Sequence, residues 1–414
     1  MGHAARRQRR REASLHRGRG PARGAPLGAV RLSAGDKQLL SPVRRIPPDD
    51  DLPPARAIGL CLSGGGYRAM LFHLGVLWRL NEAGWLPRLD RISSVSGGSI
   101  TSAVLGLAWD EVEFDERGVG RRFEDRVVAP VRRLARHGID LGAVLAGLVT
   151  PETIAERVAA AYRRHLFGRH TLQDLPEQPR FIINATNVGS GALLRFEREQ
   201  VADWRVGRVE RPEIQLAVAV ACSSAFPPVL SPYRLRLEGA EWVTEPSSDL
   251  ALPEHRDEMV LSDGGVYDNL GLETVWKRCR TVIVSDAGGQ LTPDPRPDRD
   301  WPQHFVRVLR VIDSQVRALR KGQTIESLRR GDRDGVYLGI RSHLADYDAD
   351  DPLPAPQERT MLLADVPTRL DALDGTLQER LVNWGYAICD AGLRRHLDRD
   401  AARPLGFPYP EAAV

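Results

Sequence analysis

Apolar residues along the chain form two recurring patterns, short continuous runs and longer stretches with helical spacing. Residues 57–66 are an apolar run that ends in three glycines, and residues 67–84 place apolar side chains every three or four positions. The same pair recurs at residues 89–99 and 100–109. A strand, a helix, a second strand and a second helix within about 55 residues predict parallel βαβ organisation.

The rest of the chain continues this alternation. Further helices are expected over residues 121–149, 151–167, 214–230, 301–330 and 366–397, and further strands within residues 180–196, 258–265, 280–289 and 335–340. We find no internal repeat and no second domain. The expected fold is three-layer α/β/α with a mainly parallel central sheet, in a single domain over residues 56–414 that ends in a helical extension.

Charge changes the picture at the N-terminus. The formal net charge is +3, but residues 1–48 hold eleven arginines and one lysine against Glu12 and Asp36, a net +10 that leaves −7 for the rest of the 414-residue chain. Residues 1–55 are also rich in glycine and proline and show no periodicity. We therefore expect a basic, disordered arm that can touch anionic lipid, and we predict no specific nucleic-acid partner.

The cysteines and the apolar runs limit the class of protein. The four cysteines form no C-x-x-C pair, which favours reduced structural thiols over a disulfide framework or a zinc site. No apolar run approaches the roughly 18 residues of a membrane span. We expect a cytoplasmic protein, with peripheral membrane contact through the basic arm or the apolar residues 139–149 as an alternative to burial of that segment in the core. The cysteines are Cys61, Cys222, Cys279 and Cys389.

The segment Ser93–Ser99 has the pattern of a nucleophile elbow. Ser96 follows an expected strand and precedes an expected helix, with Gly98 two residues later and Ser94 where the G-x-S-x-G pattern has its first glycine. Such a turn needs small neighbours because its serine is strained, with the hydroxyl pushed outward. Ser96 is the candidate nucleophile. The alternative is a tight turn in which Ser96 or Ser99 caps the helix.

A nucleophilic serine needs a base, and the ten histidines are poorly placed for that role. Asp263 ends an expected strand and precedes two glycines, where the carboxyl ends of parallel strands gather. Desolvation by apolar neighbours would raise its pKa and make it a better base. Asp286 and Asp268 are rival carboxylates, and a Ser–His–Asp arrangement with His255 or His304 is the alternative.

The glycines after the first strand fit two ligands. Gly64, Gly66 and Ala69 match the G-x-G-x-x-G/A pattern of dinucleotide sites, whereas the same glycines could offer backbone N–H groups to an oxyanion. A dinucleotide site also needs an acidic residue that closes the next strand. Asp90 begins that strand and does not close it, and the strand ends instead in the segment that holds Ser96. The oxyanion interpretation is therefore favoured.

Four motifs in this order resemble the patatin-like phospholipases: "SGGGYRA", "SVSGG", "SSAFPP" and "DGG", spread over residues 57 to about 290. The resemblance implies a Ser–Asp dyad without histidine, with Ser96 as nucleophile and Asp263 as base. It implies an oxyanion hole formed by Gly64, Gly65 and Gly66, and it makes Arg68 a candidate substrate-binding residue. Ser94 is a departure, because the family usually has glycine there.

The resemblance also implies an activity. It suggests a serine hydrolase that cleaves lipid acyl esters, of phospholipase A or lysophospholipase type, through an acyl-enzyme and without a metal or cofactor. The second hypothesis is a catalytically weak lipid-binding or regulatory protein on the same fold, with its elbow weakened by the serine at position 94. Polar residues near the motifs are expected to orient loops, namely Asn184, Asn187, Ser224 and Pro227.

Overall fold

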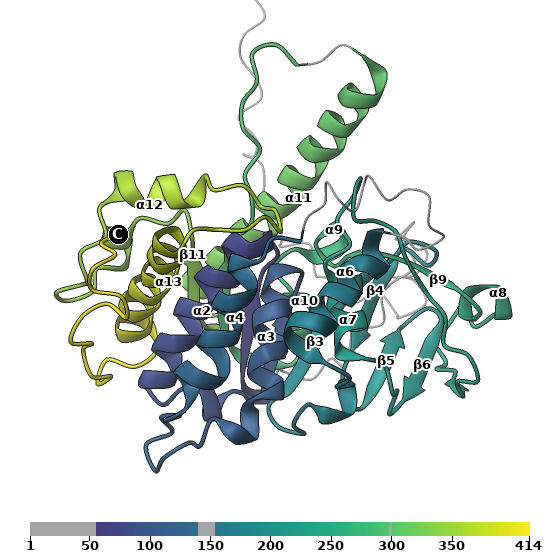
Figure 1. The fold of residues 1–414 in the computed structure, drawn as a ribbon, viewed down its shortest axis with the longest axis horizontal. Coiled ribbons are helices and arrows are strands. Elements are labelled where there is room, and N and C mark those ends of the chain that lie inside the picture. The colour runs from purple at the N-terminus through teal and green to yellow at the C-terminus, as the bar shows by residue number, and fades with distance from the viewer. Residues whose placement is uncertain (1–54, 140–153, 298–299) are drawn as a thin grey trace, which may run out of the picture. The chain divides into compact units, whose positions relative to one another are not determined.

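The computed structural model describes residues 55–139, 154–297 and 300–414, all of which belong to one unit of the chain, residues 52–414. The expected basic arm and nearly all of the apolar segment 139–149 lie outside the described residues. A mixed β-sheet forms the centre of this unit, and helices cover both of its faces (Figure 1). Among the described residues, no helix is both long enough and apolar enough to span a bilayer.

Five parallel strands form one half of the sheet. In spatial order they are β11 (Asp334–Gly339), β10 (Cys279–Asp286), β1 (Ala55–Leu62), β2 (Arg91–Ser94) and β3 (Arg180–Asn187). Their side chains alternate between two apolar clusters, one on each face. Leu60, Leu62 and Ile283 belong to the larger cluster, and Cys61, Val282 and Val284 belong to the smaller one.

Antiparallel strands extend the other half of the sheet. They are β4 (Ala192–Phe196), β5 (Gln200–Asp203), β6 (Gly207–Glu210) and β8 (Trp242–Val243), while β9 (Met259–Asp263) pairs with β3 and β7 (Tyr233–Leu235) pairs with β9. The expected α/β class is confirmed, but the sheet is more mixed than expected. The reason is local: short turns join β3 to β6, and short connections allow only antiparallel neighbours.

Most helices contribute to the larger apolar cluster. These are α2 (Gly66–Glu82), α3 (Gly97–Leu107), α4 (Ala129–Arg136), α6 (Ile154–Tyr162), α7 (Leu216–Ser223), α12 (Gln357–Ala364) and α13 (Gly375–His396). The smaller cluster is covered by α10 (Glu273–Trp276) and the last turns of α11 (Trp301–Arg330), and two further short helices are α8 (Pro253–Arg256) and α9 (Gly265–Asp268). Helix α11 has the expected bounds. Helix α12 and strands β5 to β8 were not expected, because short, charged elements leave little periodic signal.

Candidate active site

Two strands that run in opposite directions end against the same edge of β3. Strand β2 pairs with β3 as far as Ser94, which lies opposite Ile183. Strand β9 pairs with β3 in the antiparallel sense and ends at Asp263, opposite Ala185. Strand β4 pairs along the other edge of β3 at both positions. The ends of β2 and β9 therefore meet head to head, two residues apart along β3.

This arrangement differs from the expected route. The sequence predicted that Asp263 would approach Ser96 from the carboxyl end of a parallel neighbouring strand. Instead, β9 takes over the edge of β3 that β2 leaves, and it runs back toward the elbow. The two side chains are brought together, but by an antiparallel strand that the local pattern does not distinguish from a parallel one.

Ser96 lies just beyond β2, in the turn that leads into α3. Its backbone has φ 52° and ψ −119°, in the region that favours glycine, so the turn is strained and directs the side chain away from the strand. The Ser96 N–H donates to Oγ of Ser223 at 2.9 Å. The Ser96 side chain does not cap α3, and the hydroxyl of Ser99 bonds the hydroxyls of Ser94 and Ser223 instead.

Asp263 is buried, with 2 % of its surface exposed. Its Oδ1 accepts the N–H of Gly265 at 2.7 Å, and the Ser96 side chain lies near enough to the carboxylate to affect its pKa. Burial raises the pKa of Asp263 to about 7, although the N–H of Gly265 and the Ser96 side chain act in the opposite direction. At neutral pH this carboxyl therefore has the proton affinity usually found in a histidine.

The rival carboxylates have other partners. Asp286 accepts a hydrogen bond from the hydroxyl of Tyr337. Asp268 accepts the N–H of Glu273 at 2.8 Å and forms an ion pair with Arg320 at 3.0 Å. Both contacts tie neighbouring elements together. Among the expected carboxylates, Asp263 is the one whose pKa the Ser96 side chain affects.

The histidines proposed for a Ser–His–Asp arrangement lie elsewhere. His255 is part of α8, and His304 is exposed on the first turn of α11. Within the described ranges, no hydrogen bond joins either ring to Ser96 or Asp263. The geometry gives these two histidines no part in the site.

The glycine loop lies against the elbow. A Cβ atom on Gly64 would lie 3.3 Å from that of Ser96. The N–H of Gly64 donates to the carbonyl of Asn269 at 3.0 Å, so it is already used. In the described part of the chain, no acceptor takes the N–H of Gly65 or Gly66. These two groups lie at the N-terminus of α2, where backbone donors are unpaired and the helix dipole favours an anion.

Glycine is required at positions 66 and 97, because other backbone atoms approach these residues too closely to leave room for a side chain. Gly66 has φ 60°, and a Cβ there would lie 2.4 Å from the carbonyl oxygen of Arg369. A Cβ on Gly97 would lie 2.1 Å from the carbonyl oxygen of Gly66. The starts of α2 and α3 thus touch at a spot that admits no side chain. This contact sets the glycine loop beside the residue that follows Ser96.

Arg68 is buried, and both terminal nitrogens of its guanidinium donate to backbone carbonyls. Its Nη1 donates to the carbonyls of Ala364 and Val366 at 2.7 and 2.8 Å, and its Nη2 donates to the carbonyl of Ala287 at 2.7 Å. Burial lowers the pKa of Arg68 to about 10, which leaves it charged at neutral pH. With 2 % of its surface exposed, Arg68 holds loops around the glycine loop and has no free surface for the substrate contact that we expected.

His73 is a buried residue of this region that the sequence did not single out. Its ring lies within α2 and bonds the hydroxyl of Ser285 at 2.7 Å and the carbonyl of Ser63 at 2.9 Å. Burial lowers the pKa of His73 to about 4, so the ring is neutral at pH 7. It joins the end of β1 to β10 directly before the glycine loop. The only available signal was one polar residue among apolar neighbours, which is weak.

Other polar residues support the elbow. Asn184 donates to the hydroxyl of Ser93 and the carbonyl of Ser94, both at 2.9 Å, and so holds the end of β2 as expected. Ser224 was expected to orient a loop, but its hydroxyl bonds the carbonyl of Val220 within its own helix. The adjacent Ser223 contacts the elbow instead. The sequence "SSAFPP" does not reveal which of its two serines faces Ser96.

Apolar side chains lie exposed on the segments next to the site. Val266 follows the glycines after Asp263 and is 51 % exposed, and Phe226, also 51 % exposed, follows Ala225, whose carbonyl accepts the N–H of Asp263. Val188, at the end of β3, is 56 % exposed. These side chains provide apolar surface around a polar centre, which is typical of small-molecule sites.

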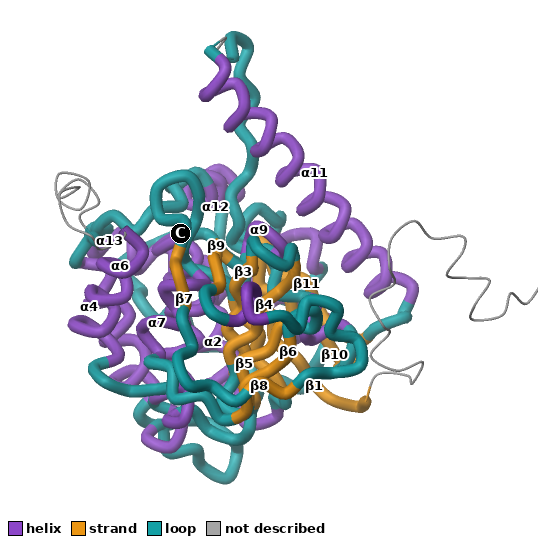
Figure 2. Tube along the Cα trace, turned by 90° about the vertical axis from the view of Figure 1, so that its right-hand side faces the viewer, coloured by secondary structure: helices purple, strands orange, loops and turns teal. Residues whose placement is uncertain are grey.

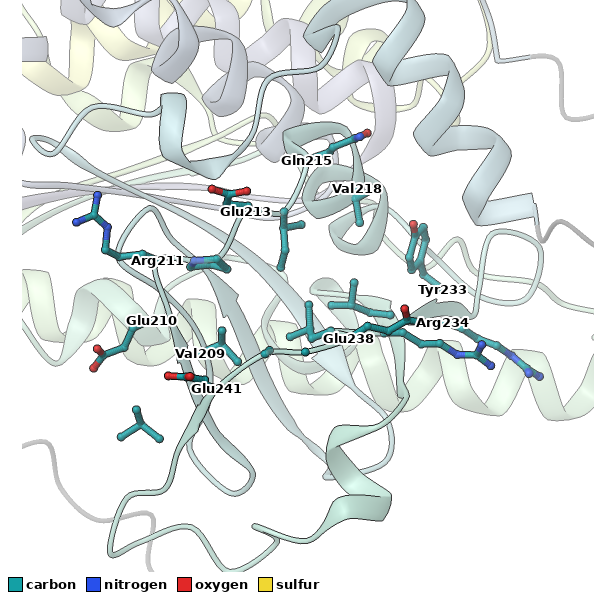
Figure 3. Close-up of a pocket in the computed structure, with 18 of the residues that line it drawn as sticks. Val209, Glu210, Arg211, Glu213, Gln215, Val218, Tyr233, Arg234, Glu238 and Glu241 are labelled. Carbon is teal, nitrogen blue, oxygen red and sulfur yellow. The ribbon is translucent and has the colours of Figure 1, made fainter.

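A pocket of about 810 Å³ lies elsewhere, between β6, β7 and the start of α7 (Figure 3). Its lining carries both charges, including Arg211, Glu213 and Arg234. Neither Ser96 nor Asp263 contributes to it. A charged lining of this kind suits an acyl chain poorly.

Comparison with known proteins places the chain in a family. The model of the family described as patatin-like phospholipase matches residues 60–276. Among solved structures, human GIVD cytosolic phospholipase A2 is similar, with a TM-score of 0.46 and 14 % identity, over 85 % of this chain and 64 % of that one. VipD from Legionella pneumophila is similar with a TM-score of 0.36 and 15 % identity, over 83 % and 67 % of the two chains.

The chain thus spans 64 % of the length of the cytosolic phospholipase, and both structural likenesses are distant. No curated protein sequence matches the chain. The family match covers more than half of the 414 residues and includes the glycine loop, Ser96 and Asp263. The chain therefore belongs to the patatin-like phospholipase family, a family of lipid hydrolases.

Proposed function

We propose that this protein is a serine hydrolase that cleaves lipid acyl esters through a dyad of Ser96 and Asp263. One observation carries the proposal: the side chain of a serine in a strained turn lies beside a buried carboxylate whose pKa is raised to about 7. A nucleophile needs a base that is ready to take a proton near neutral pH. Asp263 meets that need without a histidine.

Acylation begins when Oγ of Ser96 attacks the ester carbonyl carbon. Asp263 takes the hydroxyl proton as the new C–O bond forms, and the carbonyl oxygen becomes an oxyanion. The tetrahedral intermediate then collapses, the ester C–O bond breaks, and Asp263 returns the proton to the departing alcohol. The acyl group remains on Ser96.

The oxyanion is stabilised by the N–H groups of Gly65 and Gly66. Both lie at the N-terminus of α2, whose dipole also favours negative charge there. One such donor contributes about 3 kcal/mol to the stabilisation of the transition state. Gly64 supports the loop through its bond to Asn269 and does not act as a donor to the substrate.

Deacylation repeats these steps with water. The water oxygen attacks the acyl carbonyl carbon while Asp263 takes a proton from the water. Asp263 then donates this proton to Oγ of Ser96 as the C–O bond to Ser96 breaks and the carboxylic acid leaves. Every step uses groups that belong to this chain. Arg68 takes no part in the chemistry, because it positions the loops around the glycines.

A lipid acyl ester is the substrate class that the surroundings favour. Phe226, Val266 and Val188 offer exposed apolar surface near the dyad. An acyl chain gains free energy on leaving water for such a surface, by about 0.8 kcal/mol for each CH₂ group that is buried. Family membership supports the same class.

Turnover of p-nitrophenyl butyrate and labelling by a fluorophosphonate test the proposal. We expect the Ser96→Ala and Asp263→Asn variants to lose at least a thousandfold in kcat/KM. Ser224→Ala and Asp286→Asn are matched controls and should keep most of the activity, because the hydroxyl of Ser224 donates to the carbonyl of Val220 and Asp286 bonds Tyr337. In the parent protein, mass spectrometry should place the adduct on Ser96.

Other outcomes would replace the proposal. Parental activity in the Ser96→Ala or Asp263→Asn variant would exclude the dyad. Loss of activity on changing His255 to Ala would favour a Ser–His–Asp hydrolase. A folded parent protein that turns over no acyl ester and takes no label would favour the non-catalytic lipid-binding alternative.

A further inference from the structure

Helix α11 is attached to the sheet by its C-terminal end. It begins after Asp300, whose carboxylate accepts the N–H of Gln303 at 3.1 Å, and it ends at Gly331 in the left-handed conformation. Its last turns place Ile325 and Leu328 against the smaller apolar cluster. The remainder of the helix extends beyond the sheet, as both views show (Figure 1, Figure 2).

The extended part of α11 carries an apolar stripe that nothing in the described chain covers. Its members recur every three or four positions and so share one face of the helix. In a soluble protein such a face is normally buried against the core, and large exposed apolar patches mark interaction sites. The apolar stripe consists of Trp301, 76 % exposed, Phe305, 53 %, Val308, 40 %, Leu309, 48 %, Ile312, 54 %, Val316, 43 %, and Leu319, 62 %.

The other faces of the same segment carry its cations, together with Val311, which is 44 % exposed. Residues 301–321 contain five cationic side chains and one anionic side chain, Asp313. Arg310 is exposed on the side of the helix opposite the apolar stripe. A helix with tryptophan, phenylalanine and leucine on one face and arginine or lysine on the other has the pattern of an interfacial helix. The cations are Arg307, Arg310, Arg317, Arg320 and Lys321.

The apolar stripe ends close to the proposed catalytic site. Arg320 pairs with Asp268 at 3.0 Å, in the short segment that follows Asp263. Arg317 donates to the carbonyl of Gly289 at 2.9 Å, in the loop that follows β10. The negative charge of Asp313 is also near enough to raise the pKa of Asp263. The second half of α11 therefore lies beside the dyad.

We propose that α11 docks on an anionic lipid surface, with the apolar stripe inserted among the acyl chains and Arg310 facing the headgroups. Docking in this way would hold the dyad at the surface that supplies its substrate, and this consequence rests on the proposed function. The charge pattern favours a lipid surface over a second copy of this chain. Two copies joined through their apolar stripes would bring two basic helices together without acidic partners.

Co-sedimentation of the full chain with vesicles tests the docking separately from catalysis. Ether-linked phosphatidylcholine mixed with ether-linked phosphatidylglycerol cannot be hydrolysed at an acyl ester, so binding is measured without turnover. We expect the parent protein to bind these vesicles, to bind pure ether-linked phosphatidylcholine far less, and to lose affinity as salt is raised.

Variants locate the surface. Phe305→Gln with Ile312→Gln should weaken vesicle binding by roughly tenfold or more, because two inserted apolar side chains are lost and glutamine keeps the helix. Leu362→Gln with Leu405→Gln is the matched control, since both leucines are exposed and neither belongs to α11. Arg310→Gln should weaken binding to the anionic vesicles, whereas Arg359→Gln on α12 should not.

The outcomes separate the two proposals. Weak vesicle binding with parental turnover of p-nitrophenyl butyrate in the Phe305/Ile312 variant would support docking. Equal vesicle binding by this variant and the parent, or no binding by the parent, would overturn it even if the dyad is active. A parent dimer that becomes a monomer in this variant, with vesicle binding unchanged, would assign the apolar stripe to a second copy. Vesicle binding without any ester turnover would leave docking intact and refute the proposed chemistry.

Discussion

The hydroxyl of Ser223 accepts a hydrogen bond from the backbone N–H of Ser96 at 2.9 Å. The two residues are far apart in the sequence, at the end of α7 and in the turn before α3. The bond holds a backbone with φ 52° in place, and the hydroxyl of Ser99 reinforces it at 2.9 Å from that of Ser223. A strained turn persists only where its surroundings determine it. Ser223 is one of those determinants.

Removing this hydroxyl should loosen the nucleophile. We expect Ser223→Ala to lower kcat on p-nitrophenyl butyrate by about 10- to 100-fold with little change in KM, since small displacements of a reacting group are costly. Ser224→Ala is the matched control, because that neighbouring hydroxyl donates to the carbonyl of Val220 and not to the elbow. Equal effects of the two changes would show that Ser223 acts through general packing and not through Ser96.

The pH dependence of kcat/KM should follow the ionisation of Asp263. Burial raises its pKa to about 7, and only the ionised form can take the proton of Ser96. We therefore expect kcat/KM on a soluble ester to rise about tenfold for each pH unit below about 7 and to level off above it. The rate of fluorophosphonate labelling should have the same midpoint. A profile that is flat down to pH 5 would exclude Asp263 as the base.

The same burial should make Asp263 a cost to stability at alkaline pH. The pKa of Asp263 is raised from 3.8 to about 7 in the folded protein. The carboxyl group therefore contributes fully to the free energy of unfolding below pH 3.8, and this contribution is lost as pH rises through about 7. This loss is about 4 kcal/mol. Asp263→Asn keeps an acceptor for Gly265 and carries no charge.

Urea unfolding at two pH values measures this cost. The free energy of unfolding of Asp263→Asn should exceed that of the parent by about 2–4 kcal/mol at pH 8, and the difference should vanish near pH 4. Asp286→Asn serves as the control, because Asp286 is only partly buried, and should show no such gain. A less stable Asp263→Asn protein at pH 8 would contradict the assigned direction of the pKa shift.

The glycine loop should not accept a methyl group. In Gly66→Ala the new Cβ would lie 2.4 Å from the carbonyl oxygen of Arg369, at φ 60°. We expect kcat to fall by about a hundredfold or more as the N–H donors move away from the oxyanion. Circular dichroism and thermal unfolding separate this from loss of fold. Gly322→Ala, where no atom lies within 4 Å, is the control and should leave kcat unchanged.

Arg68 should matter for stability more than for substrate affinity. Arg68→Met would leave the carbonyls of Ala287 and Val366 without this donor in a buried region, so the free energy of unfolding should fall by about 3–5 kcal/mol. Arg341→Met removes a more exposed arginine that also donates to Ala364, and should cost less. A stable Arg68→Met protein with a raised KM would instead indicate substrate contact.

The order of strands and helices around the site could be predicted from the sequence, because each is a local pattern. A glycine run after an apolar strand, a serine among small residues before a helix and an aspartate at a strand end are visible without neighbours. These patterns pointed to Ser96, Asp263 and the loop Gly64–Gly66. The family match spans all of these residues.

Helix α11 illustrates the limit of such patterns. Its bounds were predicted from helical spacing, but the same spacing ordinarily means a buried apolar face. Burial of a helix face depends on which other elements pack against it. In the described chain the apolar stripe, which includes Phe305 and Ile312, is exposed.

The sequence by itself thus determined which residues could do chemistry, and the tertiary structure decided which groups each one contacts. Strand β9 meets β2 head to head along β3, Gly64 gives its N–H to Asn269, and Arg68 is enclosed by three carbonyls. All of these partners are distant in the chain. Hydrogen bonding and burial depend on atoms that come close only after folding, and the pKa of Asp263 depends on the same atoms, because it is set mainly by the removal of water.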